Sequence, residues 1–401
     1  MALSGSLTIG PDRAGRRVTI VDGLVSAAVP KGLAHGGLAH LACPDGDIAP
    51  GAVCAHTHIY SGLVPYGMPT PDPIPASFMQ ILGTIWWRLD RAIDAEILLA
   101  SARDYVARAL LAGTTTLIDH HESPNLIEGS LPLLANVCER LGVRALLCYG
   151  ASERNFARAE ALRGLAECRA VESSALVRGL VGLHAGFTVS DDTIRQAGEL
   201  ARELGTVLHV HVAEDQADVD DALGRGAAGP LERLLSLGAL VPGSILAHGV
   251  HLNREQVRLA SDHGCWFVHN PRSNEGNRVG YAGALSASSN VALGVDGWDP
   301  DMVAEEAALL RLAAGHGDAG VGGRLAAGHR LVAERFGTAS DALASGALGD
   351  VVVRQGGKVR HLVVGGRVVV SDGELATGDR DAVATVAREA AVRLWARMAA
   401  I

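Results

Sequence analysis

The sequence predicts an α/β protein: a (β/α)₈ barrel of the TIM type with a small β-sandwich domain built from both termini. Three observations predict this fold. Apolar strand candidates alternate with helix-length segments eight times through the middle of the chain. Nearly every one of these strand candidates ends in His or Asp, and the carboxyl ends of barrel strands build active sites. Short apolar runs separated by glycines occur at both ends of the chain.

Composition places the chain among globular proteins that can bury a large core. Of the 401 residues, 48% are hydrophobic and 20% are charged. The formal net charge of −9 argues against a nucleic-acid partner, because phosphate binding requires clustered positive charge. The chain shows no secretory leader pattern and no apolar stretch of membrane length, so we expect a cytoplasmic protein with no membrane partner. The six cysteines are scattered and are expected to be reduced core residues.

The two ends of the chain differ in character from its middle. Residues 1–50 contain short strand-like runs, and residues 346–380 contain apolar runs separated by pairs of glycines. We therefore predict that these two segments form one small β-sandwich domain. Residues 51–345 would form the barrel, and residues 381–401, which have helical spacing, would form a C-terminal helix.

The middle of the chain supplies the barrel elements in order. The strand candidates end at His58, Asp119, Tyr149, His184, His211, His248, His269 and Asp296, and examples of the helical segments between them are 96–111, 192–204 and 254–263. An open doubly wound sheet is the structural alternative, but the glycine-rich turn that it requires after the first strand is missing. The proline-rich segment 62–80 is expected to form either a lid over the strand ends or a domain or subunit contact.

The pair His56 and His58 ends the first strand candidate. Residues i and i+2 of a strand point to the same face, so both imidazoles leave the same side of the strand. Imidazole is a preferred ligand of divalent transition metals. Taken alone, the pair is equally well interpreted as two ordinary histidines in a half-buried strand.

Later strand ends add groups of matching chemistry. His211 ends the fifth strand candidate, and Asp296 ends the eighth. Together with the first pair they offer three nitrogens and one carboxylate oxygen, which can hold Zn²⁺ or Fe²⁺ and leave a position for water. A metal lowers the pKa of such a water. Glu214 and His248 have the proton-carrying chemistry that hydrolysis requires.

These motifs resemble the amidohydrolase superfamily, in its mononuclear-metal branch. That branch includes cytosine and guanine deaminases, adenosine-type deaminases and the triazine chlorohydrolases. The resemblance covers nearly the whole chain, because five motifs occur in the same order. Within the branch, residues 86–90, 119–124 and 182–188 most closely resemble the SsnA-type aminohydrolases.

The resemblance implies a role for each strand-end residue. One divalent metal per chain, Zn²⁺ or alternatively Fe²⁺, would be bound by His56, His58, His211 and Asp296. Asp296 would also orient the water. Glu214 would shuttle a proton to the substrate, and His248 would polarise the substrate or assist deprotonation of the water.

Two neighbouring histidines compete for the position on the fifth strand. His209 and His211 point to the same face by strand parity. His211 lies nearer the carboxyl end and has the His-x-x-Glu spacing with Glu214, so we favour it as the ligand. His209 is then expected to be a core or supporting imidazole.

Four further residues are candidate substrate contacts. His184 lies where relatives contact their substrates. Trp86 would stack on a flat ring, with core or dimer packing as the alternative. His121 would reach the pocket, unless it is a structural histidine. Arg154 would hold an anionic group, unless it forms a surface salt bridge.

Two departures from the family pattern bear on the metal and on the small domain. Dinuclear relatives commonly bridge two metals with a carboxylated lysine on the fourth strand. This chain has two lysines, Lys31 and Lys358, and neither lies there, so we predict one metal. A bridging carboxylate is the alternative. The run from 346 to 364 is short for the family, which puts the usual closure of the sandwich in doubt.

The sequence as a whole predicts a metal-dependent hydrolase that acts on a carbon–nitrogen bond, in particular a deaminase of a nitrogen heterocycle. A cyclic-amide hydrolase or a chlorohydrolase with the same site residues is the first alternative. A non-catalytic barrel that binds metal or ligand is the second, and the presence of Glu214 and His248 argues against it. The partner would be a small-molecule substrate, and the resemblance implies a homodimer or larger homo-oligomer.

Overall fold

The computed structural model describes residues 6–28 and 39–401, and its centre is a sheet of eight parallel strands joined in barrel order. The strands are β6 (Ala52–Thr57), β7 (Thr114–His121), β8 (Arg144–Ala151), β10 (Val181–Ala185), β11 (Leu208–Val212), β12 (Ile245–His248), β13 (Trp266–His269) and β14 (Val291–Leu293). A short strand, β9 (Val177–Gly179), pairs with β8. The predicted (β/α)₈ barrel is confirmed, and the doubly wound alternative is wrong.

The barrel closes between its first strand and the segment that follows its last strand. Thr57 pairs with Asp296 in a parallel bridge, and the main-chain N–H of Asp296 donates to the carbonyl of His56 at 3.1 Å. Gly294 permits this approach, because a Cβ there would lie 2.7 Å from the His56 carbonyl oxygen. Closure therefore brings the two ends of the sequence pattern, the His-x-His pair and the last Asp, to the same place.

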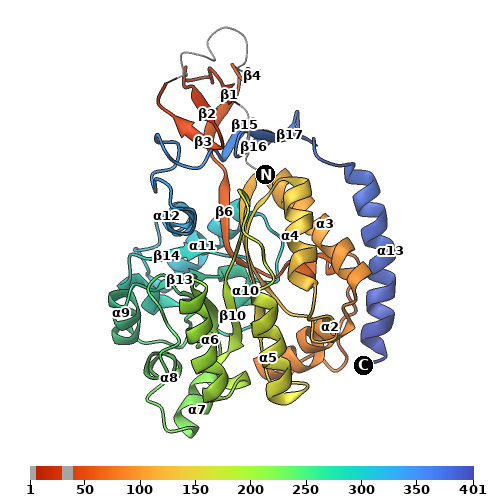
Figure 1. Ribbon diagram of the computed structural model, residues 1–401, viewed down its shortest axis with the longest axis vertical. Helices are drawn as coiled ribbons and strands as arrows, with labels where there is room; N and C mark the ends of the chain where they lie inside the picture. Colours follow the sequence, from red (N-terminus) through yellow and green to blue (C-terminus); the bar gives the residue numbers. More distant parts are fainter. Residues whose placement is uncertain (1–5, 29–38) are drawn as a thin grey trace.

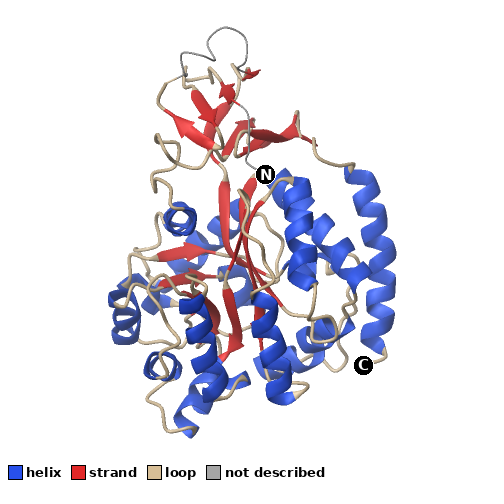
Figure 2. Ribbon diagram, viewed as in Figure 1, coloured by secondary structure: helices blue, strands red, loops and turns tan. Residues whose placement is uncertain are grey.

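Helices surround the strands on the outside (Figure 2). They include α3 (Ala95–Ala112), α4 (Ser130–Leu141), α5 (Ala157–Cys168), α6 (Asp191–Glu203), α7 (Gln216–Gly224), α8 (Pro230–Ser236), α9 (Arg254–Asp262), α10 (Pro271–Gly276), α11 (Met302–His316) and α12 (Arg324–Phe336). Three of them match predicted segments to within one residue. Each of these three begins at a polar residue, Asp94, Ser190 or Asn253, whose side chain accepts a main-chain N–H of the first turn.

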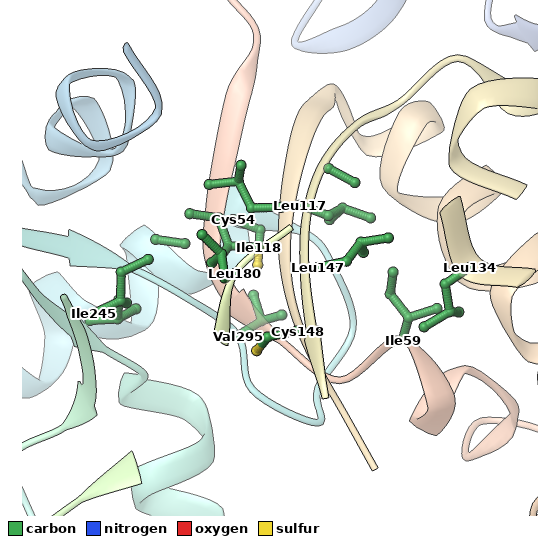
Figure 3. Packing of buried hydrophobic residues seen from close by; sticks show 14 of the residues in the cluster. Cys54, Ile59, Leu117, Ile118, Leu134, Leu147, Cys148, Leu180, Ile245 and Val295 are labelled. Carbon is green, nitrogen blue, oxygen red and sulfur yellow. The ribbon is translucent and has the colours of Figure 1, made fainter. Parts of the chain in front are cut away.

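The core fills the barrel and the space between strands and helices. Cys54, Leu117 and Ile245 are fully buried within it (Figure 3). All six cysteines are buried and unpaired, as the sequence predicted. Burial raises the pKa of the Cys54 thiol to about 12, so this cysteine behaves as a small apolar side chain.

Two small sheets lie at the amino ends of the barrel strands, at the top of Figure 1. The first contains β1 (Ser6–Ile9), β2 (Val18–Val21), β3 (Leu24–Ser26) and β4 (Ala39–Leu41), and the second contains β5 (Asp47–Pro50), β15 (Val351–Gln355), β16 (Lys358–Val364), β17 (Arg367–Ser371) and β18 (Glu374–Leu375). One hydrophobic cluster includes Ile9 and Ile20 from the first sheet and Val351 from the second. This packing supports our proposal of one small domain built from residues 1–50 and 346–380.

The last helix, α13 (Arg380–Ala399), lies along one side of the barrel (Figure 1). It is tied to α2 (Trp87–Ala92) because Arg397 Nε donates to the carbonyl of Ala92 at 2.7 Å and Arg88 donates to the carbonyl of Met398 at 2.8 Å. The helix α2 follows η2 (Leu82–Trp86), a short π-helical turn, and α1 (Phe78–Ile81). The C-terminal helix thus supports the segment that covers the strand ends.

The proline-rich segment that follows β6 begins with η1 (Ile59–Leu63) and leads into α1. Its end contributes Phe78 to the wall of the cavity described below. Residues 62–77 do not line that cavity, so the structure assigns the covering role to α1 and η2 rather than to the prolines. Within the described ranges, no helix is long and apolar enough to cross a membrane.

Candidate metal centre and substrate cavity

The carboxylate of Asp296 lies between the two histidines of β6. Its Oδ1 atom is 2.8 Å from His58 Nε2 and 3.3 Å from His56 Nε2. The hydroxyl of Ser273 donates to its Oδ2 atom. Burial acts to raise the pKa of Asp296, but the attraction of His58 and the hydrogen bonds from both histidines hold it well below its usual range. Asp296 is therefore an anion at the centre of a histidine cluster.

Backbone carbonyls fix which nitrogen of each histidine faces this centre. His58 Nδ1 lies 2.6 Å from the carbonyl of His120, and His211 Nδ1 lies 2.6 Å from the carbonyl of His184. A carbonyl only accepts, so Nδ1 carries the hydrogen and Nε2 is left for the site. Burial lowers the pKa of His58, but Asp296 outweighs it and raises that pKa to about 9. A bound cation would take the place of this proton.

His56 is held from behind by a second histidine. Its Nδ1 atom lies 2.9 Å from His209 Nε2, whose other nitrogen lies 3.7 Å from Cys148 Sγ. The ring of His211 lies 4.9 Å from the ring of His56, on the side of the site. The structure thus places His211 in the cluster and His209 behind it.

The donor atoms present suit a divalent metal. One ligand atom each from His56, His211, His248 and Asp296 can be chosen within 4.8 Å of one another. Within the described part of the chain, the buried His248 Nε2 has no hydrogen-bond partner, an arrangement that is costly unless something binds this atom. Imidazole nitrogens with one carboxylate oxygen are the donors that zinc and iron accept. This grouping contains His248, which the sequence had assigned to proton transfer.

His248 and Glu214 face each other beside the cluster. His248 Nδ1 lies 2.8 Å from Asn274 Oδ1, and its Nε2 lies 3.6 Å from Glu214 Oε2. Burial, reinforced by the charge of Asp296, raises the pKa of Glu214 well above its usual range. A carboxyl group that keeps its proton at neutral pH is a proton donor.

Three strand-end residues have an uncommon backbone conformation. Ala213, His248 and Asp296 have φ angles of 48°, 73° and 56°. These lie in the left-handed region, which residues other than glycine rarely occupy. His248 and Asp296 belong to the group of candidate ligands, and Ala213 directly precedes Glu214. Such conformations persist where the surrounding structure requires them, and they concentrate at functional sites.

A cavity opens beside the cluster and encloses about 620 Å³, its open mouth included. Its apolar wall contains Phe78, Trp86, Trp87 and Phe187, and its polar lining includes His58, Glu122, His184, His211, Glu214, Asn277 and Asp296. Large aromatic faces beside a few polar groups are typical of a site for a flat ring. Of the four predicted substrate contacts, Trp86 and His184 line this cavity.

His121 does not line the cavity, contrary to the expectation. Its Nε2 atom lies 2.7 Å from Ser123 Oγ, and its ring packs edge-on against Tyr60 and Tyr149. Successive side chains of a strand point to opposite faces, so His120 faces the barrel interior and His121 faces away from it. These contacts are those of the alternative interpretation, a histidine held by its neighbours.

Arg154 also lies outside this cavity, although it is close to it. Its Nη2 atom contacts Glu122 Oε2 at 2.6 Å and Asp90 Oδ2 at 2.7 Å, and its guanidinium stacks over Trp87. These two carboxylates offset the charge of the guanidinium, and Arg154 lines a neighbouring cavity instead. Arg154 thus forms salt bridges, as in the alternative interpretation, but these are buried rather than at the surface.

The structure adds Glu122 to the site. It directly follows β7, is 3% exposed and lines the cavity. Burial raises its pKa to about 7, even though Arg154 acts to lower it. The signal in the sequence was its position, since an acidic residue directly after a barrel strand falls on the catalytic face.

Comparison with known proteins identifies relatives along most of the chain. A family model described as the amidohydrolase family matches residues 48–369. The 8-oxoguanine deaminase of Pseudomonas aeruginosa is 29% identical over 270 residues, which cover 62% of this chain and 59% of that protein, so this match spans less than two thirds of the relative. The 5-methylthioadenosine/S-adenosylhomocysteine deaminase of Natronomonas pharaonis is 28% identical over 392 residues, which cover 87% of each chain.

Solved structures share the fold. An adenosine deaminase from Xanthomonas campestris with bound zinc superposes with a TM-score of 0.81 at 23% identity, covering 98% of both chains. A zinc complex of atrazine chlorohydrolase from Arthrobacter aurescens gives a TM-score of 0.75 at 17% identity, covering 96% of this chain and 100% of that one.

Proposed function

The chain belongs to the amidohydrolase family, and we propose that it is a metal-dependent hydrolase that deaminates a nitrogen heterocycle. One observation carries the proposal: the carboxyl group of Glu214, whose pKa is raised, stands beside a cluster of buried histidines and Asp296 at the foot of an aromatic cavity. The deaminase names of the relatives support the reaction, which replaces a ring amino group by oxygen from water and releases ammonia.

We propose one Zn²⁺ ion per chain, held by His56, His58, His211 and Asp296. Zinc is supported by His56, His211 and Asp296, which belong to one group of closely spaced donors, and by the zinc-containing proteins that share the fold. When bound, such an ion would make a water molecule acidic enough to lose a proton near neutral pH.

Three residues in and beside the cluster have separate roles in moving protons. Asp296, whose pKa is held low, is the ionised acceptor for a proton from the attacking water. Glu214 donates its proton to a ring nitrogen, and the proton taken up by Asp296 passes to the amino group, which leaves as neutral ammonia. The remaining hydroxyl proton then returns to Glu214. His248, whose Nδ1–H is oriented by Asn274, presents Nε2 towards Glu214 and the substrate carbon.

Assembly and location follow from family resemblance. We propose a homodimer or larger homo-oligomer in the cytoplasm. Sedimentation of the purified chain measures its assembly, and a monomer at micromolar concentration would contradict it.

The reaction is tested by an ammonia-release screen over amino-substituted purines, pyrimidines, pterins and triazines, with the zinc-loaded chain. We expect release from at least one class of ring and loss of release after chelation. Silence towards every ring would overturn the proposal.

Glu214→Gln tests the proton donor. An amide cannot donate an acidic proton, so we expect turnover to fall by about 10²–10⁴-fold while metal content is unchanged. Activity and elemental analysis are measured on the same preparation. Glu128→Gln, an exposed acid that pairs with Arg163, is the control and should match wild type. Unchanged turnover in Glu214→Gln would remove this residue from the mechanism.

A further inference from the structure

Three hydrogen-bond acceptors meet in the cavity wall beside the histidine cluster. Glu122 Oε1 lies 3.6 Å from His120 Nδ1 and 3.7 Å from His184 Nε2. These separations are too long for hydrogen bonds between the three groups. All three side chains are buried, and Glu122 and His184 line the cavity.

The partners of the two histidines show that both facing nitrogens are acceptors. His120 Nε2 lies 3.0 Å from the carbonyl of Leu183, so it carries the hydrogen and Nδ1 has a free lone pair. The hydroxyl of Thr188 donates to the carbonyl of Ala185 at 2.9 Å, so it accepts from His184 Nδ1 at 3.1 Å. His184 Nε2 is then an acceptor as well.

Glu122 is fixed in orientation by Arg154. The guanidinium contacts Oε2 at 2.6 Å and leaves Oε1 towards the two histidines. The same nitrogen of Arg154 also holds Asp90 at 2.7 Å, so one positive charge is shared by two carboxyl groups. Within the described part of the chain, no side chain donates a hydrogen bond to Oε1, and His120 Nδ1 has no partner.

We propose that Glu122 determines specificity by accepting a ring N–H of the substrate, so that the substrate class is heterocycles with an unsubstituted ring N–H besides the amino group that leaves. The inference rests on the proposed function for the location of the substrate. A donor placed among the three acceptors satisfies buried atoms that otherwise repel one another. Ligand atoms of His120, Glu122 and His211 lie within 4.8 Å of one another, so Glu122 stands beside the proposed metal site, where the reacting ring would lie.

Glu122→Gln tests whether the side chain at this position must accept a hydrogen bond from the substrate. Arg154 only donates, so it draws the amide oxygen of the glutamine towards itself. The amide NH₂ then faces the cavity, and the acceptor becomes a donor in a side chain of the same shape. A site built to accept an N–H would thus repel it.

The experiment measures binding without turnover. Hypoxanthine has ring N–H groups but no amino group to lose, and each of its ring-N-methylated derivatives lacks one of those donors. Binding to the zinc-loaded full chain is read from the fluorescence of Trp86 and Trp87, which line the cavity. We expect wild type to bind hypoxanthine at least about tenfold more tightly than one of these methylated derivatives. This ratio of affinities corresponds to one hydrogen bond. In Glu122→Gln the two affinities should be about equal, and in the exposed control Glu128→Gln they should differ as in wild type.

Three results would overturn the inference. Equal affinities across the series in wild type, including no binding at all, would show that no ring N–H is recognised. The same ratio in wild type and Glu122→Gln would show that the methyl group acts by its bulk. Two zinc ions per wild-type chain and one in Glu122→Gln would show that the acceptors hold a cation.

Two features keep the test independent. Arg154→Met frees Glu122 to turn and should also reduce the ratio, which provides a second variant if Glu122→Gln does not fold. Because binding is read without turnover, a negative ammonia screen would overturn the proposed function and leave the recognition result standing.

Discussion

Each imidazole that borders the site has one nitrogen committed to a fixed partner. His58 and His211 give Nδ1–H to backbone carbonyls, and His248 gives it to the Asn274 side chain. The remaining nitrogens therefore face the site as acceptors or ligands. With these partners fixed, the other nitrogen of each ring can face the carboxylate of Asp296, or a cation that replaces the proton of His58.

The pKa of Glu122, raised to about 7 by burial, predicts a pH dependence of recognition. Glu122 accepts an N–H only as a carboxylate, a form that predominates above about pH 7 and is lost below it. His120 and His184, whose pKa values are held low, stay neutral in this range, and Arg154 stays charged. We expect hypoxanthine to bind more tightly as pH rises through about 7, measured by fluorescence titration. Glu122→Gln should bind with a flat profile, and a wild-type profile that is equally flat would contradict the assignment.

At the scale of the elements, the barrel strands were the part of the fold that could be predicted from the sequence. Apolar runs that end in a polar residue marked each strand end to within a few residues, because buried parallel strands need apolar side chains on both faces. The order of His56, His211 and Asp296 along the strand ends could be predicted for the same reason.

The environment of Arg154 could not be predicted, because its partners Asp90 and Glu122 come from segments distant in sequence. The orientation of His121 could not be predicted either, because all eight residues of β7 are buried and the strand shows no alternation of exposed and buried positions.

Gly294 tests the closure of the barrel. A methyl group there would lie 2.7 Å from the carbonyl oxygen of His56 and 2.5 Å from Asn270 Oδ1, so β14 and β6 would be forced apart. We expect Gly294→Ala to reduce the free energy of unfolding by about 1–3 kcal/mol and to weaken zinc binding. Gly315→Ala, in α11 with open space around it, is the control and should not destabilise. Thermal denaturation and zinc titration measure both effects, and normal zinc affinity in Gly294→Ala would contradict the link.

At the scale of the whole molecule, the small sheets and the site occupy opposite ends of the barrel. The sheets lie where the barrel strands begin, and the cluster lies where they end (Figure 1). A buried ion pair joins the two parts: Arg144, at the start of β8, contacts Asp350 at 2.8 and 2.9 Å. We therefore expect the small domain to affect stability without affecting chemistry.

Arg144→Met tests this separation. It leaves Asp350 buried without its cation, which costs about 3–5 kcal/mol of unfolding free energy. Arg163→Met removes an exposed pair of similar geometry, with Glu128, and should cost less than about 1 kcal/mol because solvent screens it. Chemical denaturation gives the two values. The turnover of folded Arg144→Met, measured at low temperature, should equal that of wild type, and a large loss would show that the small domain acts on the site.

A zinc titration of the metal-free chain, followed by ammonia release from the best ring of the screen, tests the central claim most directly. The account predicts that activity is absent without metal, rises linearly with added zinc and reaches a plateau at one equivalent per chain. Activity that does not depend on metal, or a plateau at two equivalents, would contradict it.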